Sequence, residues 1–170
     1  MKIVCIFAEK LYAVQYDEES INEFRRLLNQ WNDIEYLFDF IQINNIEESS
    51  DFIDEIIEDA NELDIFLNQL NNNKKSLNQY FENLRVSEPI ILSLQKGKKY
   101  KIGKSRLRLY AIKIEEDVFL ITGGAIKMTQ TMQEHPDTSN ELKKLNKVRD
   151  FLIEKNITFE DAFYDFIINE

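Results

Sequence analysis

Basic and aromatic residues alternate with apolar ones in the segment 103–127, GKSRLRLYAIKIEEDVFLITGGAIK. Every second side chain of a β-strand lies on the same face. The pattern therefore predicts one face carrying Lys104, Arg106, Arg108 and Tyr110, and an opposite leucine face packed on a helix. Paired guanidinium groups can bind neighbouring phosphates, and a phenol beside them can stack on a base or transfer a proton.

Cleavage of RNA by its own 2′-hydroxyl group is a reaction that fits these residue types. It needs in-line positioning, stabilisation of the charge that develops on the phosphorus centre, and a proton donor and acceptor. That route does not require a metal. The alternative is a set of ordinary cations on a solvated sheet face, or a basic segment paired with the acidic residues 47–64. Residue chemistry alone leaves both readings open.

Charge is unevenly distributed along this chain of 170 residues and net charge −10. Residues 46–64 include acidic but no basic side chains, whereas residues 96–113 include basic but no acidic ones. The acidic total argues against a protein that simply coats nucleic acid, because such domains are normally basic. The segregation still allows a local basic surface.

Hydrophobic spacing in the first half of the chain predicts strands followed by helices. An opening hairpin is expected within residues 1–16. Two amphipathic helices are expected within residues 18–44, with a break at Asn32 and Asp33. Residues 48–70 keep helical spacing with an acidic outer face, which predicts one or two further helices.

The second half predicts a short helix at residues 77–84, a strand at 89–94, and then the basic hairpin with its acidic turn. A helix is expected over residues 138–154, where Thr138 and Glu141 have the spacing of a capping box. A last short helix carries three phenylalanines near the end of the sequence.

Four single residues call for separate interpretation. Gly123 and Gly124 indicate a bulge, or a place where another backbone or a ligand comes close. Cys5 lies in an apolar strand and is expected to be a buried, inert thiol. His135, in a polar loop after the glycine strand, is a candidate general acid or base.

Neither a membrane span nor a metal site is expected. No apolar run reaches the length that spans a bilayer, and the opening residues are too short and too quickly charged for a signal peptide. We therefore expect a cytoplasmic protein with no membrane partner. No Cys or His cluster supports a metal, and no cofactor is indicated.

The order of elements around RLRLYAIKI, FLITGGAIK and NELKKLNKVRDFL resembles the RelE and HigB group of bacterial toxins from toxin–antitoxin modules. The resemblance covers about residues 85–155, and the opening strand and helices more loosely. It implies a metal-independent endoribonuclease that cleaves mRNA on the ribosome. It also implies a small antitoxin partner, often a helix-turn-helix protein.

The resemblance also implies a set of site residues. One or other of the two arginines would bind phosphate, the tyrosine would stack or relay a proton, and the following lysine would stabilise the transition state. The candidate catalytic residues are Arg106, Arg108, Tyr110 and Lys127. The candidate RNA-binding residues are Lys99, Lys101, Lys104 and Gln130.

The chain departs from that family in being acidic and in carrying an extra helical segment, residues 44–84. We expect a single domain, 1–170, of the α+β class: a small twisted antiparallel sheet with helices packed on one face. The core sheet and C-terminal helix would lie in residues 85–155, with residues 44–84 as an acidic helical insertion. A noncatalytic module that binds protein partners through its basic sheet and acidic helices is the alternative function. A structural remnant is the third.

Overall fold

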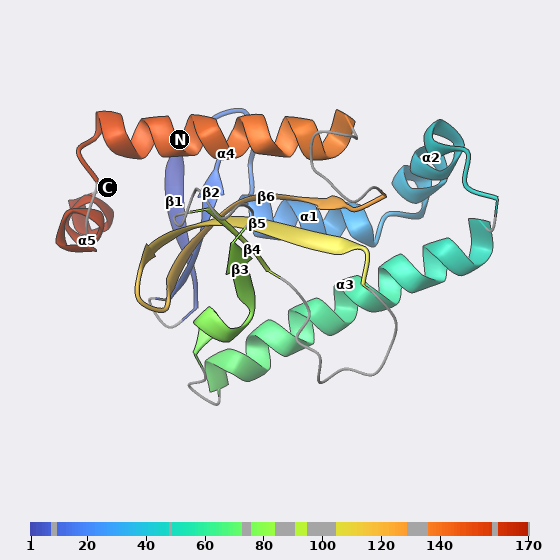
Figure 1. The fold of residues 1–170 in the computed structure, drawn as a ribbon, viewed down its shortest axis with the longest axis horizontal. Coiled ribbons are helices and arrows are strands. Elements are labelled where there is room, and N and C mark those ends of the chain that lie inside the picture. Colours follow the sequence, from blue (N-terminus) through green and yellow to red (C-terminus); the bar gives the residue numbers. More distant parts are fainter. Residues whose placement is uncertain are drawn as a thin grey trace.

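The computed structural model describes residues 1–7, 10–47, 49–72, 76–83, 91–94, 105–128, 136–157 and 160–169. Within these residues six strands form one sheet, in the spatial order β1-β2-β6-β5-β4-β3 (Figure 1). The strands are β1 (Lys2–Phe7), β2 (Leu11–Gln15), β3 (Phe81–Asn83), β4 (Ile91–Leu94), β5 (Leu107–Glu115) and β6 (Val118–Ile126).

The sheet is mixed. β2 runs parallel to β6, and the other neighbouring strands are antiparallel. The predicted α+β class is confirmed, whereas an entirely antiparallel sheet is not what forms. A tight turn forces antiparallel pairing, but β2 and β6 are separated in the sequence by helices and by three other strands, so no turn sets their relative direction.

The helices agree with the predicted spacing. The chain breaks between α1 and α2 because Asp33 caps α2, its carboxylate accepting a hydrogen bond of 2.9 Å from the backbone N–H of Glu35. The acidic segment forms one long helix, α3. The helices are α1 (Glu23–Trp31), α2 (Ile34–Asn44), α3 (Ser49–Asn72), α4 (Pro136–Glu154) and α5 (Glu160–Asn169), with a 3₁₀ turn, η1 (Leu77–Gln79).

Helices cover both faces of the sheet. Leu107, Leu109 and Ala111 of β5 share one core with α1, α2 and α3, whereas Tyr110 and Ile112 share the other with α4 and α5. In Figure 1 the orange α4 runs above the sheet and the teal α3 crosses below it. The expectation of helices on one face is therefore wrong. The reason is that β6 is buried along its whole length. Its apolar side chains lie on both faces of the sheet, so helices must cover both faces.

The acidic α3 belongs to the main core. Its buried side chains pack with the sheet and with α1 and α2, and Phe52 stacks on Phe40 of α2 with ring centroids 5.9 Å apart. Residues of the expected insertion are therefore part of the apolar interior. The other acidic side chains of α3 are exposed or half-buried, but Asp59 is buried. The buried apolar side chains of this helix are Phe52, Ile53, Ile56, Ala60, Leu63 and Leu67.

β6 contains a bulge at Thr122. Tyr110 of β5 lies opposite Gly123, but the next residue, Ala111, lies opposite Ile121, so Thr122 is the extra residue. The Thr122 hydroxyl donates a 3.3 Å hydrogen bond to the carbonyl oxygen of Tyr110. The bulge predicted from the glycine pair is confirmed.

Both glycines that follow the bulge allow a close approach. A Cβ atom on Gly123 would lie 1.8 Å from a carboxylate oxygen of Glu141 in α4. A Cβ atom on Gly124 would lie 2.7 Å from the carbonyl oxygen of Arg108 and 2.8 Å from Cδ1 of Leu27 in α1. Side chains of helices on opposite faces of the sheet therefore touch adjacent residues of one strand, in addition to the bulge that the glycine pair predicted.

Two local predictions are wrong. Within residues 77–83 the expected short helix is limited to the 3₁₀ turn η1, and β3 follows it; Asp117 in the β5–β6 turn accepts hydrogen bonds from the backbone N–H groups of Leu77 and Asn78. Cys5 is exposed instead of buried, because β1 is an edge strand of the sheet.

We predict that Gly124→Ala lowers the free energy of unfolding by roughly 1–3 kcal/mol, because the new methyl group meets backbone and two packed side chains. Urea denaturation measures the change. Asn140→Ala, on the exposed side of α4, is the control and should change it by less than about 0.5 kcal/mol. A Gly124→Ala variant as stable as the wild type would contradict the close approach.

Candidate functional site

Arg106 precedes β5 and contacts α3. Its Nε donates a long hydrogen bond, 3.4 Å, to Oε2 of Glu55, and its guanidinium carbon lies 5.5 Å from the centre of the Phe52 ring. The predicted sharing of one strand face by Arg106 and Tyr110 is therefore wrong. Strand alternation begins only at Leu107, so it does not determine the direction of Arg106.

Arg108 lies on β5 and holds the start of that strand. Its Nη1 donates hydrogen bonds to the carbonyl oxygens of Ser105, at 2.8 Å, and Leu107, at 2.7 Å. Lys127 immediately follows β6, and its backbone N–H donates to the carbonyl oxygen of Arg106 at 2.7 Å. Three of the predicted catalytic residues thus lie at one end of the β5–β6 hairpin, which we call the cationic hairpin end: Arg106, Arg108 and Lys127.

Tyr110 is not part of an open surface. Its side chain is 2% exposed and packs in the core beneath α4 and α5. Burial raises the pKa of the Tyr110 phenol to about 12, although the nearby charge of Arg108 acts in the opposite direction. The predicted stacking or proton-relay position is not accessible, because alternation along β5 directs Tyr110 toward the face that α4 covers.

The remaining predicted residues lie outside the described part of the chain. The RNA-binding candidates of this group and the single histidine therefore stay predictions: Lys99, Lys101, Lys104, Gln130 and His135.

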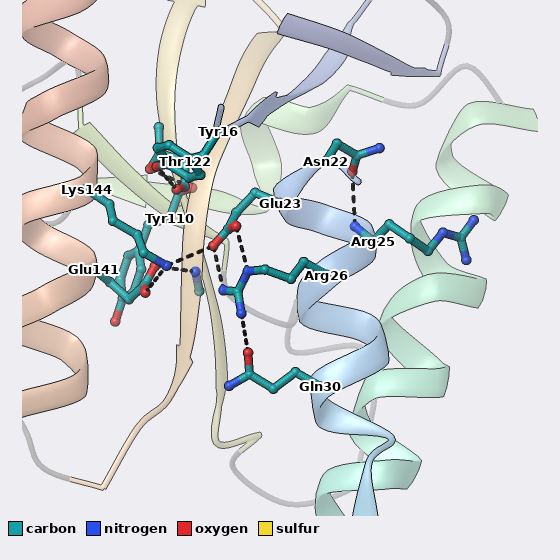
Figure 2. Close-up of polar contacts among 11 residues, drawn as sticks. Tyr16, Asn22, Glu23, Arg25, Arg26, Gln30, Tyr110, Thr122, Glu141 and Lys144 are labelled. Atoms are coloured by element: carbon teal, nitrogen blue, oxygen red, sulfur yellow. Dashed lines mark hydrogen bonds and ion pairs between the residues drawn. The ribbon is translucent and has the colours of Figure 1, made fainter. Parts of the chain in front are cut away.

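A largely buried ionic cluster lies between α1, β6 and α4 (Figure 2). Glu23 is 1% exposed and is bound by Arg26 through Nε at 2.7 Å and Nη2 at 2.6 Å. Lys144 of α4 bridges two carboxylates, donating to Glu23 at 3.1 Å and to Glu141 at 2.8 Å. We call these four residues, Glu23, Arg26, Glu141 and Lys144, the ionic cluster.

Glu141 of the ionic cluster and the neighbouring Tyr16 satisfy backbone groups of β6 where β2 no longer pairs with it. The β2–β6 pairing ends at Ile121. Beyond it, the Gly124 N–H donates to Oε2 of Glu141 at 3.0 Å, and the Tyr16 hydroxyl donates to the carbonyl oxygen of Thr122 at 2.7 Å. Side chains therefore replace the missing strand and keep buried polar groups of the backbone hydrogen-bonded.

Burial is the main cause of the pKa shifts of Glu141 and Tyr16. It raises the pKa of the Glu141 carboxyl group, against the opposing effect of Lys144. It also raises the pKa of the Tyr16 phenol, and the charges of Glu23 and Glu141 raise it further. The hydrogen bonds to Glu23 raise the pKa of Arg26, so Arg26 keeps its positive charge.

Sequence reasoning missed the ionic cluster. Glu141 was expected to form a capping box with Thr138, but α4 begins at Pro136 and the Glu141 carboxylate binds Gly124 instead. A signal for Glu23 was present, since it precedes Leu27 by four residues and so lies on the buried face of α1. A charge at such a position requires a partner.

Comparisons with protein-family models, with curated proteins and with solved structures found no match to this chain. In the described ranges, no helix is both long and apolar enough to cross a membrane. Nor do the described residues contain a group of three or more His, Cys, Asp or Glu side chains arranged to hold a metal.

We predict a pH-dependent difference in stability between the wild type and Glu141→Gln. The pKa of Glu141 is higher in the folded protein than its ordinary value of 4.5, so the folded state binds the proton more tightly. The contribution of Glu141 to stability is thus complete below that ordinary pKa and is lost as the pH rises through the folded pKa.

Urea denaturation of both proteins between about pH 3.5 and pH 7 tests this prediction. The free energy of unfolding of the wild type, relative to that of Glu141→Gln, should decrease as the pH rises from below 4.5. A relative stability that increases with pH would show that Lys144 outweighs burial.

Proposed function

We propose that this chain is a RelE/HigB-like toxin of a toxin–antitoxin module, a metal-independent endoribonuclease that acts on mRNA at the ribosome. A small antitoxin protein, of the helix-turn-helix type common in that group, would hold it in check. The proposal rests on the resemblance of residues 85–155 and on the cationic hairpin end.

The observation that carries the proposal is the placement of Arg106, Arg108 and Lys127. Arg108 pairs with Ala125, two residues before Lys127, and the backbones of Arg106 and Lys127 are hydrogen-bonded to each other. The backbones of three cationic residues are therefore neighbours at one end of the hairpin. Such a group suits the phosphates of an RNA strand and the charge that develops during their cleavage.

The roles in the proposed reaction follow from exposure. The Arg106 side chain is 41% exposed, and Arg108 and Lys127 are partly exposed, so each is accessible enough to meet a phosphate. The proposed reaction assigns no proton transfer to Tyr110, because its phenol is buried and its pKa is about 12. Attack by the 2′-hydroxyl oxygen on phosphorus, with departure of the 5′-oxygen, would give a 2′,3′-cyclic phosphate and a 5′-hydroxyl end. In this step the 2′-hydroxyl group loses its proton and the departing 5′-oxygen gains one.

A noncatalytic interaction module is the second candidate, and one observation favours it. Arg106 binds Glu55 of the acidic α3. This contact pairs the basic segment with the acidic one inside the molecule, as the alternative to an RNA site predicts. In that case the protein would bind a partner without cutting RNA.

We predict that induced expression of the wild type arrests growth of a bacterial host and creates new mRNA ends, and that Arg106→Ala/Arg108→Ala abolishes both effects. The physical reason is loss of the guanidinium groups that would bind phosphate. Growth curves and mapping of cellular mRNA ends provide the measurements.

A matched control for this experiment is Arg149→Ala/Lys155→Ala, which removes the same charge from α4 and the turn after it. It should behave as the wild type does. Normal growth and intact mRNA with folded, abundant wild-type protein would refute the ribonuclease proposal and favour the interaction module.

A further prediction for the proposed ribonuclease concerns Tyr110→Phe. Since the Tyr110 hydroxyl is buried and stays protonated at neutral pH, its removal should change RNA cleavage by less than about twofold. Cleavage rates on purified ribosomes programmed with mRNA provide the measurement, with thermal melting to confirm folding. A loss of more than about tenfold from a well-folded variant would assign the phenol a direct role.

A further inference from the structure

Arg106 is held by two side chains one turn apart on α3. Glu55 accepts a hydrogen bond from Nε, and the ring of Phe52 lies beside the guanidinium at 5.5 Å. Phe52 is itself fixed, since it is 4% exposed and stacks on Phe40. The direction of the guanidinium is therefore set by a helix instead of by its own strand.

These contacts leave the terminal nitrogens of the Arg106 guanidinium accessible to a phosphate. In the described part of the chain, Arg106 is held through Nε and through the ring, and its side chain is 41% exposed. The terminal nitrogens Nη1 and Nη2 form the fork that binds two oxygens of one phosphate. A carboxylate at Nε and a ring beside the plane are the contacts that orient such a fork without occupying it.

We propose that Glu55 is a positioning residue, which together with Phe52 orients Arg106 to bind an RNA phosphate. This inference rests on the proposed RNA-binding function and deepens it. The acidic helix α3 then completes the RNA site, although its charge is opposite to that of the site. The Glu55 side chain, 42% exposed, touches Arg106 and acts through it.

A positioning role and electrostatic repulsion predict opposite changes in RNA affinity when Glu55 is replaced. If Glu55 only repels phosphate, any substitution that removes its charge raises RNA affinity. If Glu55 orients Arg106, loss of its oxygen lowers affinity even though a negative charge disappears. Asp54, exposed on the neighbouring position of α3, measures the pure charge effect, because no contact of Asp54 with Arg106 occurs among the described residues.

The test measures binding of a short fluorescent single-stranded RNA whose 2′-positions are O-methylated, so that cleavage by 2′-hydroxyl attack cannot occur. Glu55→Ala should weaken binding about fivefold, whereas Asp54→Asn should strengthen it by up to about twofold. Glu55→Gln keeps an acceptor oxygen for Nε and should bind at least as tightly as the wild type.

The salt dependence of RNA affinity is a second measurement, and it should not change if Glu55 only stabilises the fold. Each phosphate contact to a single strand contributes about 0.7 to the slope of log affinity against log salt. Glu55→Ala should lower that slope by about 0.7, as Arg106→Ala does, and Asp54→Asn should leave it unchanged. Thermal melting of each variant confirms that it is folded.

The outcomes separate this inference from the proposed function. Wild-type protein that does not bind the RNA, or binding that Arg106→Ala leaves intact, would overturn the proposed function and the inference with it. RNA binding that depends on Arg106 but is strengthened by Glu55→Ala would overturn the inference alone, and would show that Glu55 blocks the site. Weakening by Glu55→Ala with rescue by Glu55→Gln supports positioning.

Discussion

Lys144 binds two carboxylates, those of Glu23 and Glu141, and the arrangement of the sheet around β6 depends on this contact. Taking charges out of water is costly, and removing one partner of a buried pair typically costs roughly 3–5 kcal/mol. Because α1 supplies Glu23 and α4 supplies Lys144, the pair joins helices on opposite faces of the sheet. The cluster forms beyond Ile121, where β2 no longer pairs with β6.

That contact imposes a constraint on β6. The Glu141 carboxylate lies directly over Gly123 and binds the N–H of Gly124, while Leu27 and the carbonyl of Arg108 crowd Gly124. A side chain at Gly124 would meet the backbone of Arg108, and one at Gly123 would displace the Glu141 carboxylate. The strand then leads directly to Lys127 and the cationic hairpin end.

The acidic and basic segments of the chain come together at one place in the fold. α3 is tied to the interior by its apolar face and offers Glu55 and Phe52 to Arg106. The net charge of −10 is therefore a poor guide to the local electrostatic potential around Arg106. Arg106 and Glu55 are 3.4 Å apart, so their opposite charges nearly cancel at longer distances. Local geometry governs what can bind there, because charges beyond about 8–10 Å are screened at physiological salt.

The sequence by itself determined the α+β class, the break between α1 and α2, the β5–β6 hairpin and the special role of Gly123 and Gly124. These follow from periodicity, capping and the lack of a side chain, which act over a few residues. Tertiary structure alone decided that Tyr110 is buried, that Arg106 turns to α3, and that Glu141 binds β6 instead of capping its helix. The covering of each sheet face, and the partner of each buried charge, depend on contacts between segments distant in the sequence, which no local pattern encodes.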